Sequence, residues 1–497
     1  MIRNSSLFSV SPQRIPTFLR KHKTRYGIRF YSHHEPVGIL SNDEVIEGVW
    51  IFHRHGDRSP GRPLIAEQMQ EQEAQFWRTK IPPIDRSYYH ALKDRIPTKI
   101  NENNNDGKFL DADNGREPYG FLTFKGMNQM HNTGAMISRR YADRKSSQEF
   151  LNLFDVKGYS TNYLRTVMSV QCFIDGLLFS SMPSSGKHSY NDLSSERFME
   201  TRPSLFSEDD AIIEVRDRKQ DTLNAFDKRP QFMKSLVADV VTTPEFIDKD
   251  TKAGCIAARL ANFLPGLTKA SSYGGPSGIN WIHAADHFVC RSSHNVAFTS
   301  FTHRENDMMA EETMAAMSYY VVSHLAWRFR TWYQYPPLLA AIAAPPLQEI
   351  GQQIQRISDD LVNNSNISKK PFRIYSCHDV TILSLLYGIG ADFLATNDEL
   401  IGVGLNPGNE ERWRFWPRYA STLVFELVRS KKDSSQKVRI LLNGKEVTPL
   451  SILRKKKSAL NVSDFIELIE ELSNNEVEDL SSMTNHGEER DMSNWTG

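Results

Sequence analysis

The sequence predicts an α/β fold, in which a mostly parallel sheet is flanked by helices and interrupted by a mainly helical insertion. Two apolar, β-prone runs, residues 45–52 and 372–377, have the composition of buried parallel strands. Strands that alternate with helix-prone segments along the chain are typical of α/β proteins. The middle of the chain differs, because helix-prone segments there are separated by loops rich in Gly, Ser and Pro.

The first part of the predicted core spans residues 45–180 and begins with the first of these strands. An insertion is expected at 61–118, with a helix at 66–77 and a flexible polar run rich in Asn, Asp and Gly at 101–115. A core helix is expected to begin near Thr123, because apolar residues then recur at helical spacing.

The second part of the core, residues 365–450, follows the helical insertion. Its last two strands are expected to form a closing hairpin. We expect these further core elements: an extended segment at 150–155, a helix at 167–178, the strand at 372–377, a helix beginning at 382–386, and hairpin strands at 421–428 and 438–442.

The insertion itself is expected at residues 185–360 as a helical cap. Its helix-prone segments lie at 232–241, 253–263 and 308–329. The end of the chain, residues 473–497, is acidic and polar with few apolar residues, which predicts a disordered tail.

Composition excludes several classes of function. Of the 497 residues, 60 are Lys or Arg and 60 are Asp or Glu, so the net charge is zero and nothing indicates a nucleic-acid partner. No apolar run is long enough to predict a membrane span. The few cysteines fit an intracellular compartment better than a secreted protein, although two of them could still pair. They are Cys172, Cys255, Cys290 and Cys377.

The N-terminal segment has the composition of a targeting peptide. It is rich in Arg and Ser, contains no acidic residue before Glu35, and lacks the continuous apolar core of a secretory signal. This predicts a mitochondrial transit peptide at residues 1–31, cleaved after Tyr31. The alternative is a basic tail that carries no address.

The most informative motif follows the first strand directly. Residues 54–60 place an imidazole, His55, between two guanidinium groups, Arg54 and Arg58, at the point where the strand gives way to a loop. Two arginines at this spacing can hold one phosphate through charge-assisted hydrogen bonds. A neutral imidazole beside that phosphate is a competent nucleophile. The alternative, a solvated loop with chance charges, leaves the order Arg-His-Gly-x-Arg-x-Pro unexplained.

This heptapeptide resembles the signature of the histidine acid phosphatases, which form branch 2 of the histidine phosphatase superfamily. A stretch after residue 160 resembles the family element that carries a third phosphate-binding arginine, here Arg165. The family also has a late His-Asp pair at the end of a strand, and His378-Asp379 fits it. The resemblance covers roughly residues 45–450. It implies a phosphoglycerate-mutase-like central sheet with an inserted helical cap.

The resemblance also implies a role for each residue and a phosphate monoester as the substrate. His55 would attack phosphorus and form a phosphohistidine, while Asp379 would protonate the leaving oxygen. Further groups would bind the phosphate, namely Arg54, Arg58, Arg165 and His378. No cofactor and no metal is implied, since the arginines supply the positive charge.

The substrate is less constrained, because a fold does not determine it. The insertion after Pro60, the few cysteines and the N-terminal segment resemble the lysophosphatidic acid phosphatase group, which implies a lysophospholipid substrate. One alternative is a phytase or inositol-polyphosphate phosphatase. Another, of a different class, is a catalytically inactive protein that binds a phospho-ligand. The oligomeric state does not follow from the sequence.

Overall fold

A computed structural model describes most of the chain between residues 43 and 475. The segments predicted as a transit peptide and as a disordered tail lie almost wholly outside the described residues, as does most of the polar run at 101–115. The described residues are 43–100, 109, 116–142, 146–179, 195–200, 205–206, 212–269, 275–300, 308–363, 368–396, 398–399, 403, 415–457 and 459–475.

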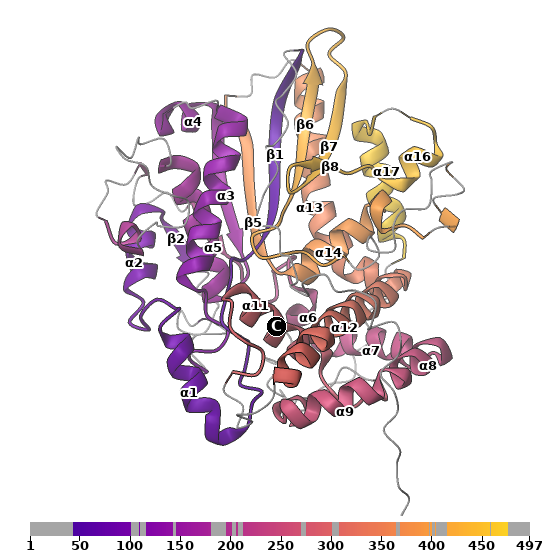
Figure 1. Cartoon of the computed structure of the whole chain (residues 1–497). Coiled ribbons are helices and arrows are strands. Elements are labelled where there is room, and N and C mark those ends of the chain that lie inside the picture. Colours follow the sequence, from indigo (N-terminus) through magenta and orange to yellow (C-terminus); the bar gives the residue numbers. More distant parts are fainter. Residues whose placement is uncertain are drawn as a thin grey trace, which may run out of the picture.

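Within the described part of the chain, eight strands form one mixed sheet, in the order β2-β4-β3-β5-β1-β6-β7-β8 (Figure 1). The five strands from β2 to β1 run parallel, and β6, β7 and β8 extend the sheet by antiparallel pairing. The predicted fold class is therefore confirmed. The strands are β1 (Glu44–Arg54), β2 (Thr98–Ile100), β3 (Phe154–Ser160), β4 (Ile213–Val215), β5 (Lys370–Cys377), β6 (Thr422–Ser430), β7 (Gln436–Leu442) and β8 (Lys445–Glu446).

Strand β1 lies in the interior of the sheet and is buried on both faces. Successive side chains of a strand point to opposite faces, so Val49 and Ile51 pack into one apolar cluster and Trp50 and Phe52 into another. The Trp50 indole N–H donates a 2.9 Å hydrogen bond to the side chain of Gln353. Burial on both faces explains why the sequence reads as a continuous apolar run and does not alternate.

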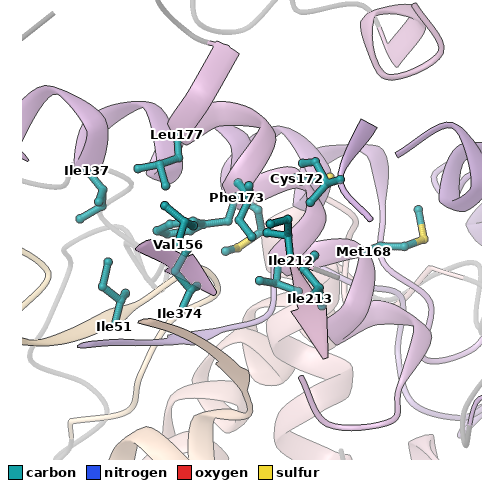
Figure 2. Packing of buried hydrophobic residues seen from close by; sticks show 14 of the residues in the cluster. Ile51, Ile137, Val156, Met168, Cys172, Phe173, Leu177, Ile212, Ile213 and Ile374 are labelled. Atoms are coloured by element: carbon teal, nitrogen blue, oxygen red, sulfur yellow. The ribbon is translucent and has the colours of Figure 1, made fainter. Parts of the chain in front are cut away.

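One face of the sheet is covered by helices α3 (Phe124–Ala142) and α5 (Leu164–Phe179). They cross closely because Gly134 has no side chain: a Cβ atom there would lie 1.9 Å from the carbonyl oxygen of Phe173. Figure 2 shows side chains of α3 and α5 packed over the strand residues Ile51, Val156 and Ile374.

The opposite face is covered by helices α13, α14 and α17. Helix α13 packs against both of the others, and its Pro345 and Pro346 lie inside the helix. The helices of this layer are α13 (Pro336–Val362), α14 (Asp379–Gly388) and α17 (Val462–Ser473). The other helices outside the middle of the chain are α1 (Glu67–Arg78), α2 (Ser87–Arg95), α4 (Ser147–Leu153), η4 (Asp392–Leu394) and α16 (Leu450–Arg454).

The middle of the chain forms a group of helices near the carboxyl end of β1 (Figure 1). Helices α6 to α12 share a hydrophobic cluster that includes Phe232, Leu236, Trp281 and Leu325 and extends to residues of α13 and α14. We call α6 to α12 the cap. The elements between β3 and α13, apart from α5 and β4, are η3 (Ser195–Phe198), α6 (Ala225–Lys228), α7 (Pro230–Val241), α8 (Pro244–Lys252), α9 (Gly254–Phe263), α10 (Gly266–Lys269), α11 (Trp281–Ser293) and α12 (Met308–Tyr333).

The extended segment predicted at residues 150–155 is wrong for its first four residues. They belong to helix α4, and β3 begins only at Phe154. A capping box starts this helix, since the Ser146 hydroxyl accepts from the Glu149 N–H and the Glu149 carboxylate accepts from the Ser146 N–H. Strands β2 and β4 were not predicted, because three residues are too few to show a period. No described helix is long and apolar enough to cross a membrane.

Candidate active site

The motif residues lie at the carboxyl ends of neighbouring parallel strands. Strand β1 ends at Arg54 and its neighbour β5 ends at Cys377, so His55 and His378 each directly follow a strand. A 3.1 Å hydrogen bond from the His55 backbone N–H to the Cys377 carbonyl continues the pairing of the two chains by one residue. Ligands of open α/β sheets bind at this edge.

His55 is held in one orientation with one ring nitrogen unused. Its Nδ1 lies 2.8 Å from the carbonyl oxygen of Gly56, which can only accept, so Nδ1 carries the proton. Its Nε2 is buried and has no hydrogen-bond partner among the described residues. Burial lowers the pKa of His55 well below its ordinary value, and the positive charges of Arg165 and Arg54 lower it further. A neutral ring with a bare Nε2 is the form that can act as a nucleophile.

His378 faces His55 and is equally buried. The two ring centroids are 5.6 Å apart and the rings are nearly perpendicular. Neither ring nitrogen of His378 has a partner in the described part of the chain. Burial, followed by the charges of Arg165 and Arg58, lowers the pKa of His378 well below its ordinary value. Buried polar atoms without partners are uncommon in proteins, so these nitrogens indicate a ligand site.

Arg54 and Asp379 form an ion pair across the strand ends. The distance from Arg54 Nη2 to Asp379 Oδ2 is 2.8 Å, and Arg54 Nη1 donates to the Pro417 carbonyl at 2.8 Å. The guanidinium also lies 4.2 Å from the centre of the Tyr419 ring. Arg54 Nε has no partner among the described residues, so the side chain is fixed in place and retains a donor.

The guanidinium of Arg58 forms an ion pair with the cap. Its Nη2 lies 2.8 Å from Asp286 Oδ1 and its Nη1 lies 3.2 Å from Asp286 Oδ2, with Asp286 on helix α11. Burial opposes the charged guanidinium, but the Asp286 carboxylate outweighs this and raises the pKa of Arg58. The same carboxylate accepts a 2.7 Å hydrogen bond from the backbone N–H of Gly61.

Arg165 reaches this edge of the sheet from the first turn of helix α5. Its side chain is buried, and its guanidinium lies 4.4 Å from the centre of the Tyr163 ring. Among the neighbouring charges, that of Arg165 lowers the pKa values of His55 and His378 most. The structure therefore brings the predicted residues together. They are Arg54, His55, Arg58, Arg165, His378 and Asp379.

Gly56 has a packing role that the sequence did not reveal. A Cβ atom at Gly56 would lie 2.4 Å from the carbonyl oxygen of Gly126 at the start of α3. A Cβ atom at Gly126 would lie 2.1 Å from the carbonyl oxygen of Asp57. The two backbones meet without side chains between them, which places the motif loop directly on helix α3.

Asp57, inside the motif, connects the loop to both the core and the cap. Its Oδ1 accepts from the Thr123 hydroxyl at 2.6 Å and lies 2.6 Å from His294 Nε2, just after helix α11. A second buried contact joins the insertion to the same cap helix, since Arg291 Nη2 lies 2.6 Å from Glu73 Oε1. Helix α11 and the residue after it are thus bound to the strand-end loop and to the insertion through three carboxylates, counting Asp286.

A pocket with an empty volume of about 700 Å³ opens at these residues. Its polar side, called the polar floor here, consists of Arg54, Arg58, His378 and Asp379. Asn224 and Asp286 also line it. The remaining side is called the apolar wall and consists of Phe226, Ile282, Ala285, Val289, Leu325, Phe329, Trp332, Val380 and Trp416.

Sequence reasoning missed the residues that hold the polar floor from the side. Trp416 donates a 3.0 Å hydrogen bond from Nε1 to Asp379 Oδ2, and Tyr419 stacks on Arg54. The signal that points to them is a run rich in aromatic residues directly before the predicted strand at 421–428. Nothing in the sequence paired Asp286 of the cap with Arg58.

The described residues contain no group of three or more His, Cys, Asp or Glu side chains that could hold a metal ion. All four cysteines are described, and none forms a disulfide: Cys255 is exposed and the others are buried.

Comparison with protein families gives one match. Residues 45–443 match the model of the histidine phosphatase superfamily (branch 2). A search of curated proteins finds none that matches this sequence.

Solved structures similar to this one have low sequence identity. The Hafnia alvei phytase in its apo form is 14% identical with a TM-score of 0.42, and the match covers 87% of this chain and 98% of that chain. The Bifidobacterium longum multiple inositol polyphosphate phosphatase, in complex with inositol hexasulfate, is 12% identical with a TM-score of 0.45, covering 83% and 89% of the two chains. These likenesses are remote, and nothing about the substrate follows from them.

Proposed function

Because the chain belongs to branch 2 of the histidine phosphatase superfamily and is a phosphatase, we propose that it hydrolyses phosphate monoesters through a phosphohistidine at His55. One observation carries this proposal. Buried nitrogens of His55, His378, Arg54 and Arg58 have no hydrogen-bond partner among the described residues at this strand-end site. A phosphoryl group supplies acceptor oxygens for the N–H groups of Arg54, Arg58 and His378, and a phosphorus atom for the bare Nε2 of His55.

The proposed first step transfers the phosphoryl group to the enzyme. His55 Nε2 attacks phosphorus, while the bond from phosphorus to the ester oxygen breaks. The Gly56 carbonyl holds the proton on Nδ1, which leaves the lone pair of Nε2 available for attack. Arg54, Arg58 and Arg165 stabilise the charge on the phosphoryl oxygens in the transition state.

Asp379 is proposed as the general acid of that step. Its proton passes to the ester oxygen as the alcohol leaves, so no alkoxide has to form. In the second step the Asp379 carboxylate takes a proton from water, which attacks the phosphohistidine and releases phosphate. The position of Asp379 beside Arg54, 2.8 Å away, is consistent with an acid close to the bound phosphate.

The proposed substrate has one phosphate and an apolar remainder, such as lysophosphatidate. The apolar wall supports this, because an acyl chain bound along it would be removed from water. Each buried methylene group would then favour binding by about 0.8 kcal/mol. Six of the wall residues belong to the cap helices α11 and α12: Ile282, Ala285, Val289, Leu325, Phe329 and Trp332.

The alternative activity is that of a phytase or inositol-polyphosphate phosphatase, and the pocket supports it less. Several phosphates on one small ring require several cationic subsites. Among the residues lining the pocket, the arginines are Arg54 and Arg58, and both belong to the first subsite. Asp286 faces the same space and disfavours further phosphates by charge repulsion.

A phospho-ligand-binding protein without activity is the alternative from a different class. Such a protein needs cationic residues to bind phosphate, but it needs neither a nucleophile nor an acid. The bare Nε2 of His55 and the placement of Asp379 beside Arg54 favour turnover over binding alone.

Phosphate release by the purified chain tests these proposals together. We would compare an acyl lysophosphatidate, phytate and 4-nitrophenyl phosphate between pH 4.5 and 7.5, with a His55→Ala variant as the control. A kcat/KM highest for lysophosphatidate and lost in the variant supports the lipid substrate. Preference for phytate would discard the lipid and keep the mechanism. Phosphate binding without turnover of any substrate would favour the binding protein.

The cellular location is a separate proposal. We propose that residues 1–31 direct the chain to mitochondria, because they combine Arg and Ser with an absence of acidic residues. Fusion of residues 1–45 to a fluorescent protein tests this, and a diffuse cytosolic signal would refute it.

A further inference from the structure

We propose that Trp416 is a positioning residue that holds the general acid Asp379 for proton transfer to the leaving group. Its indole Nε1 donates to Asp379 Oδ2 at 3.0 Å, from the segment that precedes strand β6. The proposal rests on the phosphatase activity and on the assignment of Asp379 as the acid. It does not depend on the lipid substrate.

The hydrogen bonds of Asp379 determine where its proton can reside. An ionised carboxylate has about four lone-pair sites. Arg54 Nη2 at 2.8 Å and Trp416 Nε1 at 3.0 Å both occupy Oδ2, and the Val380 N–H occupies one site of Oδ1 at 2.9 Å. One site of Oδ1 is left for the proton, so Trp416 helps to fix which oxygen acts as the acid.

The indole is itself held by the cap. Its ring packs edge-on against Phe329 of helix α12, with 5.1 Å between the ring centroids, and both side chains line the pocket. The same helix supports the acid from its other side, because the Tyr333 hydroxyl donates to the Val380 carbonyl at 3.1 Å. Helix α12 therefore supports the position of Asp379 indirectly. Phe329 packs on Trp416, which bonds to Asp379, and Tyr333 bonds to the neighbouring Val380.

The chemistry of the leaving group gives a selective test. When the bond from phosphorus to the ester oxygen breaks, an alkyl alcohol needs the proton of Asp379, whereas a nitrophenolate leaves without it. A loss of acid positioning therefore slows alkyl esters and spares aryl esters. A general loss of folding or of phosphate binding slows both alike.

The experiment compares Trp416→Phe with the unmodified full chain on two substrates of similar size and polarity, 4-nitrobenzyl phosphate and 4-nitrophenyl phosphate. We would measure kcat/KM, which does not include hydrolysis of the phosphohistidine. Loss of one hydrogen bond to a charged group predicts a fall of about 10-fold or more for the benzyl ester, and of less than about 3-fold for the phenyl ester.

Two controls complete the design. Asp379→Asn should show the same selectivity with a larger loss, since it removes the proton itself. Trp327→Phe, in the cap helix α12 but outside the pocket, should leave kcat/KM unchanged for both substrates. Equal losses of Trp416→Phe on both esters, or no loss on the benzyl ester, would overturn the proposal, and a variant that had unfolded would also lose the phenyl ester.

Discussion

The polar floor and the apolar wall of the pocket are built in different ways. The floor residues Arg54, Arg58, His378 and Asp379 come from two short segments at the carboxyl ends of β1 and β5. The wall residues come from several helices, mainly α11 and α12 of the cap. Neighbouring parallel strands fix the floor through the backbone, whereas the wall depends on how helices pack. We therefore expect the sheet to position the groups proposed for the reaction, and the cap to determine which substrates bind.

The largest expected effect comes from removing the proposed nucleophile, His55, which lies beside the floor residue His378. His55→Ala leaves no group to accept the phosphoryl unit, so kcat/KM on 4-nitrophenyl phosphate should fall by about 10⁵-fold or more, as in other covalent enzymes. His53→Gln is the control, since His53 stacks on Phe173 with 5.2 Å between the ring centroids, away from the pocket. Substantial residual activity in His55→Ala would show that another residue is the nucleophile.

The next effect tests the place where floor and cap meet. Arg58→Ala should lower kcat/KM by about 10²- to 10³-fold, as expected for loss of one oxyanion donor. It also leaves Asp286 buried without its partner, which predicts a loss of about 3–5 kcal/mol in the free energy of unfolding.

The double variant Arg58→Ala with Asp286→Asn separates these two roles. It should recover part of the lost stability in urea titrations, because the unpaired charge is gone, while kcat/KM stays low. Recovery of activity together with stability would mean that Arg58 acts on the fold and not on the phosphate.

The wall should affect only substrates that contact it. Ile282→Ala removes apolar contact from the pocket, so kcat/KM for a long-chain lysophosphatidate should fall by about 10-fold. The same variant should change kcat/KM for 4-nitrophenyl phosphate by less than about 3-fold. Ile256→Ala, at a half-buried cap position outside the pocket, is the matched control. Similar losses on both substrates would remove the distinction between floor and wall.

The smallest expected effect is on the folding stability of the protein at acidic pH without phosphate. The pKa of His378 is lowered in the folded chain, so below its unfolded value of about 6.5 only the unfolded chain takes up the proton. Folding stability is therefore lost as the pH falls, by about 1.4 kcal/mol per pH unit for this side chain. Between pH 6 and 5, His378→Gln should show a shallower decline than the unmodified protein.

The control for that slope is His90→Gln, a change at an exposed histidine. It should leave the pH dependence of the urea midpoint unchanged. An identical decline in His378→Gln and the unmodified protein would be evidence that His378 can be protonated in the folded state. Saturating phosphate should reduce the decline, because a bound dianion favours the protonated imidazole.

Much of the floor could be predicted from the sequence, because its residues are local in the chain. Arg54 and Arg58 lie within one motif, beside His55, and His378 is adjacent to Asp379. The strands before them could be read as apolar runs since both are buried on two faces. Backbone pairing then brings the two segments together without any further information.

The wall could not be predicted in the same way. A leucine such as Leu325 reads equally well as the core of the cap or as the side of a pocket. The contact of Trp416 with Asp379 joins segments 37 residues apart, and neither carries a periodic pattern that indicates it. The short strands β2 and β4 could not be predicted for a different reason. They are extended because of tertiary pairing and not because of local preference.

The carboxylates that bind helix α11 also determine how the molecule unfolds. Asp57, Asp286 and Glu73 all lie outside bulk water and connect this helix to the strand-end loop and the insertion. Lifting the cap away would expose two ion pairs and the contact between His294 and Asp57 at once, so cap and sheet are expected to open as one cooperative unit. The amide of Gly61, bonded to Asp286, would then exchange with deuterium only as fast as the whole molecule opens.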